Sequence, residues 1–221
     1  MSGVAASRGL RVLISGAADG VGLACAYVFA DRGAELILCD SDGTALTRAS
    51  DAAGGFSRFC DVISEASVSV FASEIDAKFD SIDVLINAAG DGYVRSLGMM
   101  QMSRALLPML RRGSGRRLII NVAPAGGMSA TGMFPYASSR EGFQGLSDAL
   151  ADQTRGSMID VVSIAPNLRF EVDEKPETPF YRIERVDETG TAERILELVA
   201  SARPEWRQRA MRRTVSPRKE F

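Results

Sequence analysis

The sequence has 221 residues, of which 46% are hydrophobic and 24% charged, proportions typical of a globular protein whose length suits one domain. The formal net charge of −2 gives no reason to expect a nucleic acid or a membrane surface as a partner. Histidine is absent, which excludes catalytic triads and metal sites built on an imidazole ring.

Short runs rich in Val, Ile and Leu alternate along the chain with longer segments of helical periodicity, as in βαβ units around a parallel sheet. We predict strands at residues 11–15, 35–39, 56–61, 82–87, 117–122 and 160–164. Helices are expected at residues 21–32, after Ser64, at 136–155 and at 191–202. The pattern predicts an α/β fold: a single-domain, doubly wound (Rossmann) parallel sheet of about six strands, flanked by helices, over residues 1–202.

The last nineteen residues differ in composition from the rest of the chain. Residues 203–221 carry seven basic side chains against Glu205 and Glu220. We predict a basic C-terminal tail, which is either solvated or anchored on a neighbouring subunit through Trp206 and Met211.

The chain carries no sequence signal of export or membrane insertion. No apolar stretch approaches the roughly 18 residues that span a bilayer, and the first residues lack the pattern of a signal peptide. We therefore expect a cytoplasmic location. Cys25, Cys39 and Cys60 are odd in number, far apart in the sequence and each set in an apolar pattern, so we expect reduced, buried thiols and no disulfide or metal site.

A glycine pattern follows the first predicted strand, at the turn into the first helix. Glycines allow a tight turn and close approach of a pyrophosphate, whose charge then faces the free amides at the helix N-terminus. The candidate cofactor-binding residues of this loop are Ser15, Gly16, Asp19, Gly20, Val21 and Gly22.

Asp40 follows directly after the second predicted strand, eighteen residues after Gly22. A carboxylate at this place can accept hydrogen bonds from both hydroxyls of the adenosine ribose, and it would repel a 2′-phosphate. Ala17 and Ala18 supply no cation for such a phosphate, so the sequence favours NAD over NADP. The alternative is that Asp40 only begins a turn with Ser41, Asp42 and Gly43.

Four motifs in this order and spacing resemble those of the short-chain dehydrogenase/reductase family. The glycine pattern is similar to that family's TGxxxGxG, with Ser15 for the threonine, and Asp61-Val62 is similar to the pair that meets adenine. Asn87-Ala88-Ala89-Gly90 resembles the family's NNAG turn, and residues 136–140 (Tyr-Ala-Ser-Ser-Arg) fall where the family has YxxxK.

The resemblance extends from Leu10 to about Pro166. It implies a nicotinamide cofactor, hydride transfer between the cofactor and a small-molecule carbonyl or alcohol substrate, and a homodimer or homotetramer. It also implies that Tyr136 is the acid/base and that further cofactor contacts come from Asp61, Val62, Asn87, Ala88, Ala89, Gly90, Arg140 and Pro166.

The chain departs from the family at its other catalytic positions. Arg140 replaces the lysine that lowers the pKa of the tyrosine and passes protons; its guanidinium keeps the positive charge but is larger and never gives up a proton. Ala123 and Pro124 occupy the stretch of the family's serine, for which Ser129 or Thr131 would have to substitute. Arg95 aligns with the family's catalytic asparagine.

Two further departures affect the substrate pocket. The interval between Gly90 and Arg95 is short, so part of the pocket wall is expected to be deleted, and Pro166-Asn167 stands for the family's Pro-Gly.

These residues leave three functional hypotheses open. The first is a working NAD-dependent oxidoreductase with Tyr136 as acid/base and Arg140 as its electrostatic support. The second is a catalytically impaired relative that acts as a binding, regulatory or assembly partner, because members of a catalytic set act as a unit. The third is different chemistry on an anionic substrate held by Arg95 and Arg140.

Overall fold

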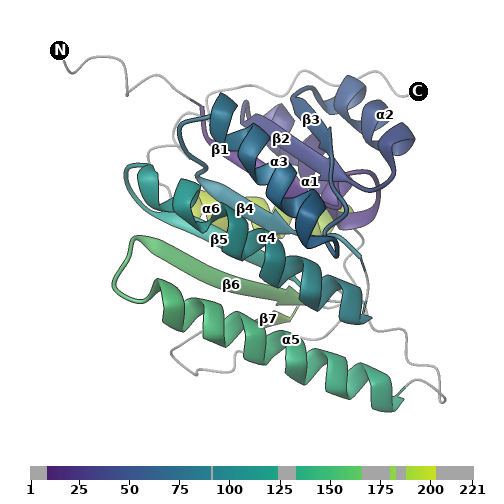
Figure 1. The fold of residues 1–221 in the computed structure, drawn as a ribbon, viewed down its shortest axis with the longest axis vertical. Coiled ribbons are helices and arrows are strands. Elements are labelled where there is room, and N and C mark those ends of the chain that lie inside the picture. Colours follow the sequence, from purple (N-terminus) through teal and green to yellow (C-terminus); the bar gives the residue numbers. More distant parts are fainter. Residues whose placement is uncertain (1–8, 91, 124–132, 166–179, 183–187, 203–221) are drawn as a thin grey trace.

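The computed structural model describes residues 9–90, 92–123, 133–165, 180–182 and 188–202. In this part of the chain, strands pair in parallel in one sheet with the order β3-β2-β1-β4-β5-β6-β7 (Figure 1). The strands are β1 (Arg11–Ser15), β2 (Glu35–Asp40), β3 (Phe56–Phe59), β4 (Val84–Asn87), β5 (Arg117–Val122), β6 (Ile159–Ala165) and β7 (Phe180–Arg182).

Helices cover both faces of this sheet, which confirms the predicted doubly wound α/β fold (Figure 1). They are α1 (Gly20–Asp31), α2 (Gly43–Ala53), α3 (Glu65–Lys78), α4 (Gly92–Arg112), α5 (Met133–Thr154) and α6 (Glu188–Ala202). Helices α3, α4 and α5 pack on one face, and α1, α2 and α6 on the other. None of the helices in the described ranges is both long and apolar enough to cross a membrane.

The central strands β1, β4 and β5 are buried along their whole length, which explains why they consist mainly of apolar residues. In β1, Val12 and Ile14 belong to the core cluster shared with α1 and α6, whereas Leu13 belongs to the cluster shared with α3 and α4. All three side chains are fully buried. Alternate residues of one strand therefore hold the two helix layers in place.

The six predicted strands are all present, with the predicted bounds in β1 and β5. The third strand ends at Phe59 instead of 61, and the long fifth helix begins at Met133, three residues before Tyr136. The structure adds β7, α2 and α4, for which no range was predicted. Helix α2 was not predicted because it contains few large apolar side chains, and only Leu46 and Ala49 of its eleven residues are buried.

Helix α4 begins at Gly92, two residues after Gly90, so the short interval read from the sequence leaves no room for a separate segment there. The predicted tail, residues 203–221, lies outside the described residues, and the assignment of residues 1–202 to one domain stays a prediction.

Candidate functional site

The candidate site lies at the carboxyl edge of the sheet, where the chain changes direction between β1 and β4. From β1 the chain continues outward to β2 and β3 on one side, while β4, β5 and β6 extend the sheet on the other. Crevices form at such switch points in open α/β sheets. Ser15 and Asn87, both predicted site residues, end these two strands and are paired in register.

The glycine loop after β1 packs against the turn after β4 with no space for side chains. A Cβ on Gly16 would lie 2.6 Å from the Cα of Ala89, and Gly16 has a φ of +73°, which favours glycine. The N–H groups of Gly16 and Ala17 both donate to the carbonyl of Cys39, at 3.0 and 3.2 Å. The loop is thereby fixed across three strand ends.

Gly22 brings the first turn of α1 against this loop. A Cβ on Gly22 would lie 1.9 Å from the carbonyl oxygen of Gly16, a distance that no side chain can adopt. The start of α1 and the loop therefore form one tightly packed unit, as the predicted role of these glycines requires.

The N-terminus of α1 is not capped by its own N-cap residue. Asp19 makes no side-chain capping hydrogen bond, whereas Asp42 and Ser64 cap α2 and α3 by accepting from the amides of Ala45 (2.9 Å) and Ser67 (3.3 Å). The first amides of a helix lack intrahelical partners and carry the positive end of the helix dipole. Those of α1 are available to an anion.

Asp40 connects the end of β2 to the glycine loop. Its Oδ2 accepts a hydrogen bond from the amide of Ala18 at 3.1 Å, and its Oδ1 accepts one from the amide of Asp42 at 3.0 Å. The second contact is the local turn given above as an alternative, so Asp40 makes the turn and also reaches the loop. An ionised carboxylate has about four acceptor positions, so both oxygens can still accept from ribose hydroxyls.

Asp61 and Val62, the expected adenine pair, follow β3 at the same edge. Oδ1 of Asp61 accepts from the amide of Ile63 at 3.1 Å, and the Val62 side chain is buried. A Cβ on Gly98 of α4 would lie 2.5 Å from Cγ2 of Val62, so the two segments are in close contact. Val62 thus forms a fixed wall between β3 and α4.

The Asn87 side chain takes part in a buried chain of polar groups. Its amide nitrogen donates to Oγ of Ser103 (3.0 Å) and to Oδ1 of Asn121 (2.9 Å), and the Asn121 amide donates to Oγ of Ser147 (3.2 Å). We call these four residues the polar chain. It links the ends of β4 and β5 to helices α4 and α5. Ser103, Asn121 and Ser147 were not predicted, although Asn121 interrupts the apolar run of β5 between Ile120 and Val122, which is a usable signal.

The rest of the turn after β4 forms one side of the site. Ala88 donates its N–H to the carbonyl of Ser15 at 3.1 Å. Gly90 has a φ of +74°, and a Cβ there would lie 2.6 Å from Cγ1 of Val94. Ala88 and Ala89 therefore bring the backbone of the turn to the glycine loop, and Gly90 packs against Val94 of α4.

Arg95 reaches from α4 to the end of β5. Its Nη1 donates to the carbonyl oxygen of Val122 at 3.2 Å, and Ala123 follows directly, buried. The structure therefore brings Arg95 to the segment where the family's serine is replaced.

The remaining predicted residues are only partly covered. Tyr136 and Arg140 lie in α5, where the structure describes the helical backbone and not their side chains. Pro124, Ser129, Thr131 and Pro166 lie outside the described residues.

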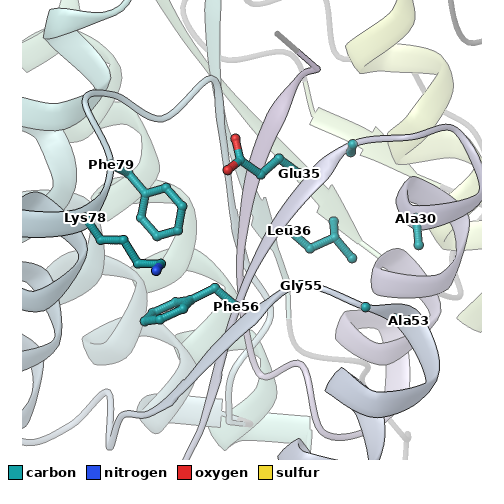
Figure 2. Close-up of a pocket in the computed structure, with 10 residues that line it drawn as sticks. Ala30, Glu35, Leu36, Ala53, Gly55, Phe56, Lys78 and Phe79 are labelled. Carbon is teal, nitrogen blue, oxygen red and sulfur yellow. The ribbon is translucent and has the colours of Figure 1, made fainter.

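A cavity of about 380 Å³ opens at the opposite, amino edge of the sheet (Figure 2). The Lys78 ammonium lies 4.9 Å from the ring centroid of Phe56 and 5.9 Å from that of Phe79, and the Arg11 guanidinium pairs with Glu35 at 2.8 Å. The chain's own cations already occupy the aromatic faces and the carboxylate. We therefore assign these groups to packing of the amino edge.

The residues at the carboxyl edge fit a dinucleotide. The loop holds its glycines where any Cβ would collide, α1 offers uncapped amides to a pyrophosphate, and Asp40 stands beside the loop for a ribose.

Comparison with known proteins gives a family match and several relatives. Residues 11–169 match the family model described as short chain dehydrogenase. The chain is 30% identical to rabbit (Oryctolagus cuniculus) L-fucose dehydrogenase over 173 residues, covering 68% of this chain and 60% of that protein. It is 31% identical to bovine (Bos taurus) dehydrogenase/reductase SDR family member 7B over 188 residues, covering 72% and 58%.

Among solved structures, the fold is similar to that of a metagenomic short-chain oxidoreductase in complex with NADP. The TM-score is 0.68 at 23% identity, over 87% of this chain and 91% of that one. The matched region spans about three fifths of the length of the two relatives named above.

Proposed function

Because this chain belongs to the short-chain dehydrogenase family, we propose that it binds NAD(H) and transfers hydride between the nicotinamide and a carbonyl or alcohol substrate. Oxidoreductase chemistry and a nicotinamide cofactor follow from membership of the family. The preference for NAD(H) over NADP(H) and the identity of the acid/base are what we propose for this chain.

The observation that carries the NAD(H) proposal is the position of Asp40. Its carboxylate contacts the amide of Ala18 in the glycine loop and lies at the end of β2, where the adenosine ribose of a dinucleotide is expected. A carboxylate accepts hydrogen bonds from ribose hydroxyls and repels a 2′-phosphate. In the glycine loop, residues 15–22 contain neither Lys nor Arg.

For the reaction itself we assign the proton transfer to Tyr136. When bound, the nicotinamide supplies or accepts the hydride. The Tyr136 phenol would give a proton to the forming alkoxide or take one from the alcohol, and Arg140, one helical turn later, would favour the phenolate through its charge. Asp40, the α1 amides and the Ala88–Gly90 turn would hold the cofactor.

A substitution at Asp40 tests the cofactor proposal. Asp40→Asn keeps an acceptor for the Ala18 amide but removes the charge, so NADH should bind about tenfold more weakly or worse. The same change should raise the ratio of NADPH to NADH affinity, because the repulsion of the 2′-phosphate is gone. Calorimetric titration of both nucleotides measures this.

Asp51→Asn is the matched control, since Asp51 is an exposed residue of α2 and its change removes the same charge. Equal changes in both variants, or wild-type protein that prefers NADPH, would contradict the NAD(H) proposal.

A second candidate function is supported by the replaced catalytic positions: a cofactor-binding relative with impaired catalysis and a regulatory or assembly role. Arg140, Arg95 and the Ala123-Pro124 stretch all depart from the family's set. Following nicotinamide absorbance over a panel of alcohols and ketones separates the two. Turnover that Tyr136→Phe abolishes, with NADH binding kept, supports the enzyme; binding without turnover supports the second function.

If no turnover is found and the loss of the family's serine and lysine explains the inactivity, Pro124→Ser combined with Arg140→Lys should create turnover. If the double variant shows no turnover either, the short β4–α4 connection is the better explanation of the inactivity. The cytoplasmic location and the homodimer or homotetramer stay predictions, which fractionation and sedimentation can test.

A further inference from the structure

A carboxylate from the far end of the described chain lies beside the phosphate-binding end of α1. Glu188 is the first residue of α6, and Gly20 is the first residue of α1. Oε1 of Glu188 lies 3.7 Å from the position that a Cβ on Gly20 would take. The two helices thus begin next to each other at the proposed pyrophosphate site.

The backbone that carries Glu188 is held in place by packing. Thr191 and Ala192, in the first turn of α6, are fully buried. Further along, Ile195 and Val199 join the core cluster that contains Phe29 of α1. Glu188 itself is exposed, so its carboxylate can turn away from Gly20 while its backbone stays fixed.

The local charge is negative where an anionic ligand is expected. Asp19 and Glu188 both lie at the N-terminus of α1, and residues 15–22 include no basic side chain. The ion pairs found among the described residues do not include Glu188. A carboxylate near a helix N-terminus interacts favourably with the same amides that would bind a phosphate.

We infer that Glu188 is an affinity-determining residue of the dinucleotide site, which competes with the pyrophosphate for the N-terminus of α1. The inference rests on the proposed function. Binding of a dinucleotide turns the carboxylate away from Gly20 and brings two negative charges close to it. Both effects lower the affinity for the nucleotide, and dissolved salt weakens the second by screening.

The test compares Glu188→Gln with Glu193→Gln, which removes the same charge from an exposed position of the same helix. The dissociation constant of NADH is measured by calorimetry at about 0.02 M and about 0.5 M salt. Glu188→Gln should bind NADH about fivefold more tightly than wild type at low salt and less than about twofold more tightly at high salt. Glu193→Gln should stay within about twofold of wild type at both.

Glu188→Asp is a third arm, which keeps the charge and should bind NADH no more tightly than wild type. Thermal unfolding of all variants shows that they fold alike. Unchanged or weaker NADH binding by Glu188→Gln would overturn the inference, as would an equal gain in Glu193→Gln. If neither the wild-type protein nor any variant binds NADH, the proposed function itself fails. If the wild-type protein binds NADH and Glu188→Gln binds it equally well, only the inference about Glu188 fails.

Discussion

Among the glycines of the described residues, Gly22 is the one at which an added Cβ would come closest to another atom. A Cβ there would lie 1.9 Å from the carbonyl oxygen of Gly16, so the loop or the first turn of α1 would have to move. We expect Gly22→Ala to lower the free energy of unfolding by about 3 kcal/mol, a cost typical of overpacking at a rigid site, and to weaken NADH binding.

Gly43→Ala is the control for this prediction. Gly43 begins α2, and nothing lies within 4 Å of the position that a Cβ there would take, so alanine should change the stability by less than about 0.5 kcal/mol. Urea denaturation of the two variants measures the difference. Similar losses in both would show that the α1 turn is more adaptable than its packing indicates.

The three cysteines are buried, as predicted, but the pKa values of their thiols differ. Burial raises the pKa of the Cys25 thiol well above its usual range, and burial also does most to raise the pKa of Cys39. A hydrogen bond from Cys39 instead lowers the pKa of Cys60. The two residues are 21 positions apart in the sequence and meet because β2 and β3 are neighbours.

Thiol labelling tests this ranking, because the thiolate is the reactive form. In native protein treated with iodoacetamide at mildly alkaline pH, we expect Cys60 to be alkylated before Cys39 and Cys25. Peptide mass spectrometry gives the order, and raising the pH should narrow the differences as the other thiols ionise. Early labelling of Cys25 would contradict the prediction.

At the scale of whole elements, the polar chain connects helix α5 to strand β5. Ser147 accepts from the Asn121 amide and is fully buried, eleven residues after Tyr136 and therefore at nearly the same angle around the helix. Ser147→Ala leaves that amide without its partner, which should cost about 1–3 kcal/mol of unfolding free energy.

Ser73→Ala, on the exposed side of α3, should change the stability by less than about 0.5 kcal/mol. Thermal or urea unfolding compares the two serines. If Ser147→Ala costs no more than Ser73→Ala, the polar chain does not hold α5 to the sheet.

Elements were predictable where one local pattern determines them. Strands β1 and β5 read as apolar runs with clear ends, and Ser64 marks the start of α3. The site, too, was predictable only where a local pattern in the sequence determines it. The glycine loop and Asp40 follow from spacing along the chain, whereas the approach of Glu188 to Gly20 depends on how α6 packs on α1, which no local pattern encodes.

At the scale of the whole molecule, α6 joins the far end of the described chain to its first helix. Ile195 is fully buried in the cluster that also contains Phe29 and Ile14. We expect Ile195→Ala to cost about 2–5 kcal/mol, because it opens a cavity between α6, α1 and the sheet.

Leu198→Ala provides the comparison, since Leu198 is only partly buried beside the same cluster and should cost less. Urea unfolding followed by circular dichroism measures both. A smaller loss for Ile195 than for Leu198 would mean that the α1–α6 contact gives little to the stability of the domain.

The strand order also has a consequence for synthesis. Strand β1 is made first, and β2 pairs with one of its edges soon afterwards, but its other partner, β4, begins only at Val84. A growing chain therefore carries the apolar segment Arg11–Ser15 with one open edge until residue 87 has been added. Unpaired apolar edges associate with other chains, so the growing chain can aggregate through this edge of β1 during that interval.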